Sequence, residues 1–375
     1  MFLRILFLVQ GEGRGHLTQA LALAPALRAA GHEVVAAVVG ASPARVLPGF
    51  FADEIGAPVE RLDEPGFGYG VSGVRWGQTL ASNVRRSPGF VRALSGMDAA
   101  FARYRPDVVV SFFSLLGGLY GRLRAPHAGG RPLPFVCVGH QYLFHHPAYP
   151  FPPGEPFARG TARAWTALTA PPGARRLALS FYPAPDLPAL GLRVVPPLLR
   201  PALRSMRVRD DGSLLVYLLH ADYAAHVEAW CARHPEQEVH AFWDRADAPE
   251  TLHVGARLTF HQLSGERFLE QMARCHALVC TAGFESVSEA MYAGKPALMV
   301  PVAGHFEQSC NARDATAAGA GLYRRTFDLD ALLDHARDYR PVPGFRTWAD
   351  GAADVFVDEI ERAAGVAGRA RAVAV

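Results

Sequence analysis

The sequence has neither a long hydrophobic run nor a large excess of charge of one sign. Its apolar runs fall short of the ~18 residues that a membrane-spanning helix needs, so we expect no transmembrane segment. The 38 basic residues nearly balance the 35 acidic ones, and the net charge is +3. Because nucleic-acid-binding proteins usually carry a larger basic excess, we expect no nucleic-acid partner.

Cysteine is scarce as well. The five cysteines are scattered, their number is odd, and no CxxC pair occurs. This pattern favours free thiols in a reducing compartment over a disulfide framework. Residues 2–9 (FLRILFLV) are apolar but only as long as a strand, and a glycine-rich loop follows them directly. We interpret them as a buried strand rather than a signal peptide, and we expect a cytoplasmic protein, with work at the inner membrane surface left open.

Hydrophobic residues are abundant enough for two folded domains. They make up half of the 375 residues, while 19% are charged, so sizeable cores can form. Short apolar runs alternate with helical stretches in both halves, which is typical of doubly wound parallel sheets. We predict two Rossmann-like α/β domains facing a cleft, since such sheets bind ligands beyond the carboxyl ends of their strands.

Prolines mark the expected boundary between the domains. Residues 195–201 (VPPLLRP) contain three of them, which suits a hinge. We place the N-terminal, acceptor-binding domain at 1–195, the linker at 196–201, and the C-terminal, nucleotide-binding domain at 202–346. A final helix at 347–364 follows, and we expect residues 365–375 to form a frayed tail.

A glycine-rich loop leads from the first expected strand into the first helix. Residues 11–16 read GEGRGH, and Gly13 and Gly15 let the backbone approach a ligand at a helix N-terminus. A dinucleotide fingerprint would need glycine where His16 stands and an acid at the end of the second strand. His16 is instead a candidate general base, because histidine titrates near neutral pH. The alternative is a histidine that only caps or packs the helix.

The stretch from residue 280 to 312 is the most informative part of the chain. Thr281 and Gly283 leave a strand end and Ser286 opens a helix, so hydroxyls and free backbone N–H groups can hold a diphosphate. Glu289 lies on the same helix face as Ser286 and can reach two ribose hydroxyls. An ordinary capping box formed by Ser286 and Glu289 is the alternative.

A polar helix start follows the next expected strand, in the sequence HFEQ at 305–308. Glu307 offers hydrogen-bond acceptors and Gln308 offers both donors and acceptors, which suits neighbouring sugar hydroxyls. A solvated helix start, which also favours acids, is the alternative. The order of the pieces, from strand and small-residue loop to this acid–amide pair, favours a nucleotide-sugar site.

These motifs resemble those of GT-B glycosyltransferases, in the group that contains MurG-type enzymes and UDP-glucosyl or glucuronosyl transferases. GEGRGHLTQALAL resembles the family's N-terminal loop and helix, TAGFESVSEAMYAGKPALMVP its donor loop, and FEQSCNA its donor-sugar element. The resemblance implies a final helix that crosses back to the first domain. It also implies the following roles: catalysis or acceptor contact for His16, diphosphate binding near Gly283 and Ser286, ribose binding by Glu289, and sugar binding by Glu307 and Gln308.

One part of the family pattern is missing. Many members place an aspartate near the end of the third or fourth N-domain strand, where it orients the histidine. The corresponding stretch here, residues 111–114, reads SFFS. Glu12 and Asp107 are the candidate substitutes. The donor loop begins with Thr281, as in MurG-like sequences, where plant-type members have a phosphate-binding histidine.

The loop after the expected strand at 135–138 is rich in histidine and aromatic residues. We predict that His140, Tyr142 and Phe144 face the acceptor, and a loop packed on its own domain is the alternative. No acid or cysteine stands at ligand spacing from the histidines, so we expect no metal site. Arg122 and Arg124 form basic spots of a kind that the family can use on anionic membranes. Peripheral membrane contact therefore stays open beside an interpretation as solvated surface.

We predict a glycosyltransferase that moves a sugar from a nucleotide-sugar, with UDP as the expected nucleotide, to an acceptor hydroxyl. The resemblance implies inversion, and we expect no metal and no other cofactor. The acceptor is a small molecule, a glycan or a lipid. Two alternatives remain. The first is a UDP-GlcNAc 2-epimerase-like isomerase on the same fold, which would need several acids in the cleft, where the N-domain looks poor in them. The second is a nucleotide-sugar-binding protein without catalysis.

Overall fold

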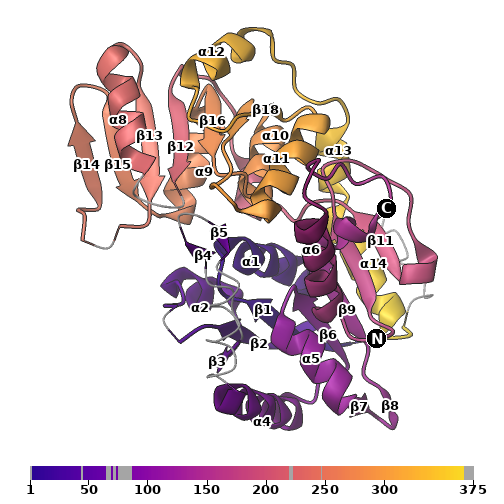
Figure 1. The fold of residues 1–375 in the computed structure, drawn as a ribbon. Coiled ribbons are helices and arrows are strands. Elements are labelled where there is room, and N and C mark those ends of the chain that lie inside the picture. The colour runs from indigo at the N-terminus through magenta and orange to yellow at the C-terminus, as the bar shows by residue number, and fades with distance from the viewer. Residues whose placement is uncertain are drawn as a thin grey trace, which may run out of the picture.

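The computed structural model describes residues 2–43, 45–64, 69–70, 73–74, 87–218, 223–245 and 247–366. Within them the chain forms two α/β domains, one above the other in Figure 1, each built on a sheet of seven strands. This confirms the predicted fold class. The expected tail lies outside the described residues from 367 onward.

The sheet of the N-terminal domain has the strand order β11-β10-β9-β6-β1-β2-β3, and every neighbouring pair is parallel. Helices cover both of its faces, which explains why the strands are continuous apolar runs. Its strands are β1 (Arg4–Gln10), β2 (Glu33–Ala41), β3 (Val59–Asp63), β6 (Val108–Phe112), β9 (Phe135–Gly139), β10 (Arg175–Leu179) and β11 (Leu192–Val195).

The second sheet repeats this design in the order β14-β15-β13-β12-β16-β17-β18. Within the described strands of this sheet, only the edge strand β14 runs antiparallel, paired with β15. The strands are β12 (Leu214–Leu218), β13 (Val239–Trp243), β14 (Thr251–Val254), β15 (Leu258–Gln262), β16 (Ala277–Cys280), β17 (Ala297–Met299) and β18 (Gly321–Tyr323).

The helices connect consecutive strands and pack on the two sheets (Figure 1). Those of the first domain are α1 (Arg14–Ala29), α2 (Gly49–Ile55), α4 (Ser87–Tyr104), α5 (Leu115–Arg124) and α6 (Pro156–Leu168), with short 3-10 helices η1 (His140–His145) and η2 (Pro188–Leu190). Those of the second are α7 (Pro201–Ser205), α8 (Ala224–Arg233), α9 (Gly265–Arg274), α10 (Phe284–Ala293), α11 (Phe306–Ala317), α12 (Leu329–Asp338), α13 (Phe345–Asp350) and α14 (Ala352–Ala363). Two-residue ribbons pair β4 (Tyr69–Gly70) with β5 (Gly73–Val74) and β7 (His127–Ala128) with β8 (Arg131–Pro132).

The end of the chain returns to the first domain, as the resemblance implies. The expected single helix at 347–364 is two helices, α13 and α14, which meet at Gly351. From α14, the buried Glu359 bonds to Arg175 of β10 and to Arg193 of β11. Figure 1 shows α14 lying along the N-terminal sheet. The two domains are therefore held together at the linker and again at this crossing.

A single hydrophobic cluster runs through the junction of the two domains. It contains Phe7 from β1, Phe284 from α10 and Phe356 from α14. The rings of Phe181 and Phe284, from different domains, lie 4.6 Å apart between centroids. The domains thus share apolar surface, and this shared core fixes how they sit against each other.

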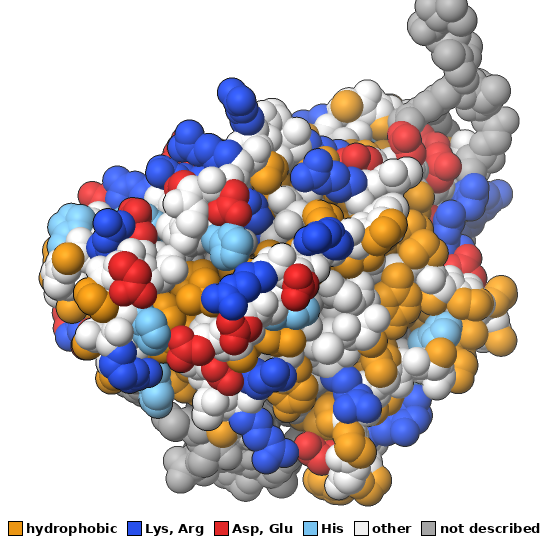
Figure 2. Space-filling model, turned by 90° about the horizontal axis from the view of Figure 1, so that it is seen from above, with side chains coloured by type: hydrophobic (Ala, Val, Ile, Leu, Met, Phe, Trp, Pro, Cys, Tyr) orange, Lys and Arg blue, Asp and Glu red, His pale blue; other side chains and the backbone are white. Residues whose placement is uncertain are grey.

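On the face shown in Figure 2, acidic and basic side chains are interspersed over the described surface rather than gathered by sign. Among the described residues, no helix is both long enough and apolar enough to cross a membrane. The basic spots are partly used inside the fold. Arg122 donates to the carbonyls of Ala167 and Ala170, and Arg124 forms an ion pair with Asp98.

Candidate functional site

The candidate site lies where the carboxyl ends of the two sheets meet. The loop after β1 leads into α1, while the loops after β16 and β17 lead into α10 and α11. The first turn of α1 approaches α10 so closely that a Cβ at Gly15 would lie 3.5 Å from Glu285 Cγ. A Cβ at Gly13 would meet nothing within 4 Å. Gly15 thus permits the helix contact, while Gly13 borders open space.

His16 sits in the first turn of α1 and is only 8% exposed. Its ring stacks on Phe113 with centroids 5.5 Å apart. Phe113 stands in the SFFS stretch that lacks the family's aspartate, and its φ of 55° is in the left-handed region that non-glycine residues rarely adopt. Burial lowers the pKa of His16, and the bond to Gln19 and the charge of Glu307 offset this only in part. The imidazole is therefore neutral near pH 7, as a general base must be.

A chain of hydrogen bonds links His16 to the second domain through Gln19. His16 Nδ1 lies 3.1 Å from Gln19 Oε1, and Gln19 Nε2 donates to Glu285 Oε1 at 2.6 Å. With its nitrogen toward Glu285, the Gln19 amide turns its oxygen, which only accepts, toward the imidazole. His16 must then carry its proton on Nδ1, which leaves Nε2 as the basic nitrogen.

Glu285 was not among the predicted site residues. Burial raises its pKa to about 8, with the charge of Glu289 adding to the shift, while the bond from Gln19 and the charge of Arg200 oppose it. Its second oxygen, Oε2, is buried without a partner among the described residues. The sequence contains a signal for the partner Gln19 only, which follows His16 by three positions and therefore lies on the same helix face.

Glu307, predicted to hold a sugar, faces the N-terminal domain. Gln141 Nε2 donates to its Oε1 at 3.0 Å across the domain boundary. Burial raises its pKa, and the proximity of His16 and the bond from Gln141 lower it. The candidate base and the predicted sugar-binding acid therefore come close together from opposite domains.

Gln308 lies beside Glu307 but turns toward its own loop. Its Oε1 accepts from the backbone N–H of Val302 at 2.8 Å, and the side chain is 7% exposed. The helix α11 begins at Phe306 with His305 as its N-cap, within the stretch 305–308 that was expected to start a helix. Gln308 thus shapes the turn between β17 and α11.

The donor loop forms a tight turn between β16 and α10. Thr281 is buried, Ala282 has a φ of 59°, and Gly283 is the N-cap of α10 without any side-chain cap. Asn311 of α11 steadies the turn, since its Nδ2 donates to the Ala282 carbonyl at 3.2 Å. The uncapped first-turn N–H groups of α10 are suited to an anion.

Ser286 and Glu289 do not form the capping box that was the alternative for them. The helix begins two residues earlier, and Ser286 Oγ donates to the Gly283 carbonyl at 3.2 Å. Glu289 is 2% exposed, and Arg200 of the linker binds both of its oxygens, at 2.6 and 2.7 Å. A carboxylate has about four lone-pair positions, so this bidentate pair leaves acceptor capacity on Glu289.

The predicted acceptor-side residues divide into two groups. Tyr142 and Phe144 are buried in the N-terminal core, and the Tyr142 hydroxyl pairs with Thr169 at 2.9 Å. For these two the alternative holds, because the loop packs on its own domain. His140 lies at the domain boundary instead, where its ring stacks on Phe284 with centroids 4.1 Å apart.

His140 belongs to a buried polar cluster between the domains. Its Nε2 lies 3.5 Å from Asp314 Oδ2 of α11, and Tyr182 donates to Asp314 Oδ1 at 2.6 Å. Burial lowers the pKa of His140 to about 4 and raises that of Asp314 to about 6. This cluster helps to hold the two domains together. No local sequence pattern predicts it, because its members are far apart in the chain.

Neither candidate substitute for the missing aspartate bonds to His16. Glu12 accepts from the Ser42 backbone at 2.5 Å, and Asp107 accepts from the Arg4 backbone at the opposite end of the sheet. The N-domain does hold one more acid at a strand end, contrary to expectation. Glu64 follows β3 and accepts from the N–H groups of Leu115 and Leu116 at the start of α5.

Two of the three histidines of the 140–146 loop, His140 and His146, have protein partners. His140 Nδ1 bonds to the Leu179 carbonyl and His146 Nε2 to the Pro185 carbonyl. Over the described ranges, no three His, Cys, Asp or Glu side chains are grouped as a metal site would need. The functional groups available at the strand ends are therefore a neutral imidazole, an uncapped helix N-terminus and several buried carboxyl groups.

Comparisons with known proteins agree with this arrangement. A family model described as Glycosyl transferase family 1 matches residues 3–336. No curated protein matches the chain at a significant level. Among solved structures, the chain is similar to the glycotransferase of kitacinnamycin, with a TM-score of 0.61 and 18% identity over 96% of this chain and 99% of that one.

Two further solved structures match over nearly the whole chain. The spinosyn rhamnosyltransferase SpnG complexed with thymidine diphosphate has a TM-score of 0.52 and 21% identity, over 97% of this chain and 98% of that one. MurG of Acinetobacter baumannii has a TM-score of 0.53 and 17% identity, over 96% and 99%. At these identities the likeness is one of fold, namely the GT-B arrangement of two facing domains.

Proposed function

The chain belongs to glycosyl transferase family 1, and we propose that it moves a sugar from a nucleotide-sugar donor to an acceptor hydroxyl without a metal. One observation carries the proposal: hydrogen bonds join the two domains beside the expected donor element, from Gln19 to Glu285 at 2.6 Å and from Gln141 to Glu307 at 3.0 Å. A transferase needs its base beside the donor sugar, and here the candidate base adjoins the element predicted to hold that sugar.

The C-terminal domain supplies the groups for the donor. The diphosphate binds at the uncapped N-terminus of α10, next to Thr281 and Gly283, where N–H groups and the helix dipole favour negative charge. Glu285 does not repel it, since a pKa of about 8 keeps that carboxyl mostly protonated at neutral pH. Glu289, oriented by Arg200, accepts from the ribose hydroxyls, and Glu307 with Gln308 holds the sugar.

The N-terminal domain supplies the base. His16 Nε2 takes the proton of the acceptor hydroxyl as its oxygen attacks the anomeric carbon of the sugar. The bond from that carbon to the diphosphate oxygen breaks in the same displacement, so the configuration inverts. The leaving diphosphate is stabilised by the N–H groups at the start of α10. Domain contact excludes water and limits donor hydrolysis.

Gln19 takes the place of the absent aspartate. Its amide oxygen accepts from His16 Nδ1 and so fixes the tautomer, and Glu285 holds the amide from the other domain. Because one end of this chain of bonds lies on each domain, the base is fully oriented only while the domains touch. Gln19 is thus a positioning residue, and it couples domain contact to the basicity of Nε2.

The donor and the reaction type are tested together. The protein is incubated with UDP-sugars and, because SpnG was solved with thymidine diphosphate, with thymidine diphosphate sugars, each with and without a panel of hydroxyl acceptors. Release of nucleoside diphosphate that requires an acceptor supports transfer. Formation of an epimer without an acceptor supports the isomerase, and tight binding without turnover supports a binding protein. Either of the last two results overturns the proposal.

The role of His16 is tested by substitution. His16→Ala should lower kcat by about 10²-fold or more, as is typical for loss of a general base, while nucleotide affinity stays close to wild type. Glu289→Ala should instead weaken nucleotide binding. His127→Ala, which changes an exposed histidine of β7, is the matched control. A His16→Ala enzyme that retains most of its kcat contradicts the assignment.

A further inference from the structure

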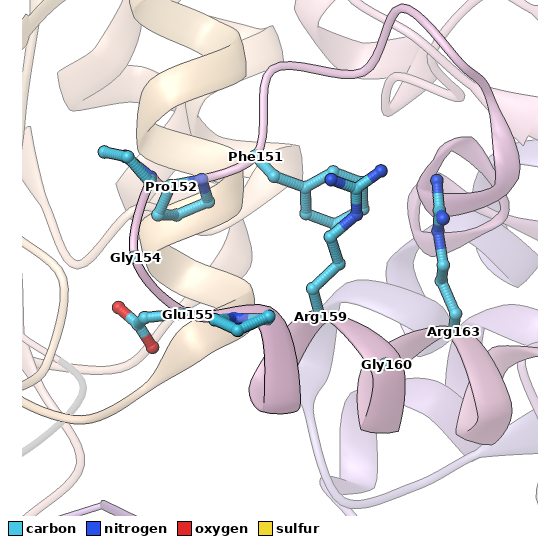
Figure 3. A pocket seen from close by; sticks show the side chains of 9 residues that line it. Phe151, Pro152, Gly154, Glu155, Arg159, Gly160 and Arg163 are labelled. Atoms are coloured by element: carbon cyan, nitrogen blue, oxygen red, sulfur yellow. The ribbon is translucent and has the colours of Figure 1, made fainter.

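A cavity of about 480 Å³ lies between the loop that follows η1 and the first turns of α6 (Figure 3). The walls are formed mostly by rings and short side chains, with two guanidinium groups on one side. The lining residues are Phe151, Pro152, Pro153, Gly154, Glu155, Pro156, Arg159, Gly160 and Arg163.

The two arginines share one aromatic ring. The guanidinium carbon of Arg159 lies 4.6 Å from the centroid of Phe151, and that of Arg163 lies 5.3 Å from it. Figure 3 shows Arg159 over the ring and Arg163 about one helical turn further along. The ring stabilises both cations, but it neutralises neither of them.

Arg159 is exposed and Arg163 is half-buried, so both guanidinium groups can be reached by an anion from solvent. Burial lowers the pKa of Arg163, and repulsion from Arg159 lowers it further. Arg163 is fixed by a bond from its Nε to the Phe144 carbonyl at 2.6 Å. Within the described part of the chain, no carboxylate lies within ion-pair distance of either guanidinium. An incoming oxyanion would relieve the repulsion and take bidentate hydrogen bonds.

The shape of the cavity is set before any ligand arrives. Prolines at 152, 153 and 156 restrict the backbone, and Gly154 has a φ of 81°, which a residue with a side chain would adopt only with strain. Pro156 is the first residue of α6. A preformed wall of this kind lowers the entropic cost of binding, and the proline rings offer an apolar surface to the body of a ligand.

The cavity adjoins the predicted sugar-binding element. Phe151 stacks on Phe306, with centroids 6.3 Å apart and ring planes within 13°. Phe306 directly precedes Glu307, which Gln141 holds from the N-terminal domain. A molecule seated in the cavity would therefore lie next to the donor sugar, on the N-domain side.

We propose that this cavity binds the acidic end of the acceptor: an apolar ring system that carries a carboxylate or phosphate, with the oxyanion between Arg159 and Arg163. This inference rests on the proposed function only in naming the ligand as the acceptor, because the chemistry of the ligand is inferred from the cavity itself. The acceptor hydroxyl that receives the sugar sits at the other end of the molecule, toward His16.

Binding of small probes tests the chemistry without any need for turnover. Benzoate, phenyl phosphate, benzyl alcohol and inorganic phosphate are titrated calorimetrically into wild type, Arg159→Gln and the control Arg337→Gln, which changes an exposed arginine of α12. Benzoate or phenyl phosphate should bind, and Arg159→Gln should weaken it about tenfold or more, while Arg337→Gln binds like wild type. Whether benzoate or phenyl phosphate binds more tightly distinguishes a carboxylate acceptor from a phosphate acceptor. Benzyl alcohol, which lacks the charge, should bind more weakly than either.

Three results overturn the proposal. The first is probe affinity that Arg159→Gln does not change. The second is inorganic phosphate binding as tightly as phenyl phosphate, since the apolar walls would then be unused. The third is binding to vesicles with anionic lipid but not to soluble probes, which would make the cavity a membrane contact. Nucleoside diphosphate binding is measured in parallel and should be equal in all variants. If wild type does not bind nucleoside diphosphate, the proposed function is refuted. Probe binding that depends on Arg159 would still support the proposal for the cavity.

Discussion

At the scale of single residues, Gln19 decides how His16 is presented to the cleft. An amide orients an imidazole as a carboxylate does, but it adds no negative charge that would raise the pKa of the ring. The pKa of His16 is lowered by burial, so the free base persists at mildly acidic pH. We therefore expect the acid limb of the kcat/KM profile to fall below the ordinary histidine pKa of 6.5.

Two substitutions at Gln19 separate orientation from packing. Gln19→Leu keeps the size but removes both hydrogen bonds, and should lower kcat about 10- to 100-fold with donor KM little changed, as for other orienting partners. Gln19→Glu places a charge beside the ring and should move the acid limb to higher pH, because it favours the imidazolium. The measurement is kcat and kcat/KM against pH. A Gln19→Glu profile that overlays the wild type would show that Gln19 only packs.

At the scale of elements, the glycines of α5 and α6 show where helices are in closest contact. A Cβ at Gly118 of α5 would lie 2.0 Å from the Leu168 carbonyl at the end of α6, whereas a Cβ at Gly160 of α6 would meet nothing within 4 Å. Gly118 is therefore required by packing against rigid backbone. Gly160 only weakens its helix, through the entropy of the unfolded chain.

The two glycines make a matched pair for a stability measurement. Gly118→Ala should lower the free energy of unfolding by at least about 2 kcal/mol, because backbone must shift to admit the methyl group. Gly160→Ala should raise it by about 0.5–1 kcal/mol. Urea unfolding followed by circular dichroism gives both values. Equal effects of the two changes would mean that α5 and α6 do not pack as described.

At the scale of the whole molecule, α14 closes the two-domain structure by returning to the first sheet. Burial alone would raise the pKa of Glu359, but its bonds with Arg175 and Arg193 outweigh that effect and hold the pKa below the usual 4.5. The direction of the pH dependence of stability follows from the linkage between proton binding and folding. A lowered carboxyl pKa stabilises the fold at pH above 4.5, and this stabilisation is lost as the pH falls through the folded-state value.

Removing this carboxylate should be costly. Glu359→Ala leaves two partly buried arginines without their partner and should destabilise the protein by about 3–5 kcal/mol at neutral pH. The gap between variant and wild type should narrow as the pH falls from 4.5 through the lowered pKa of folded Glu359, where this carboxylate becomes protonated. Thermal unfolding across pH is the measurement, with Asp358→Asn at an exposed position of α14 as the control. A gap that is constant with pH would refute the ionic account.

The fold class and the order of the elements could be predicted from local patterns. Buried parallel strands are local apolar runs, and helix starts after glycine-rich turns are local too, so Gly15, Gly283 and Glu307 could be placed at helix starts from their neighbours in the chain. The edge strand β14 and the division of the final helix at Gly351 were not anticipated, because edge pairing and helix breaks depend on what packs beside them.

Which side chains meet depends on the folded arrangement of the two domains. Gln19 with Glu285, Gln141 with Glu307, and Arg200 with Glu289 are pairs separated by 266, 166 and 89 positions, and no local pattern marks them. Tyr142 and Phe144 are a further case. Their aromatic side chains were predicted to face the acceptor, but in the folded protein they are buried. Local sequence fixes backbone propensity, whereas burial and charge pairing depend on contacts that exist only after the two domains have folded against each other.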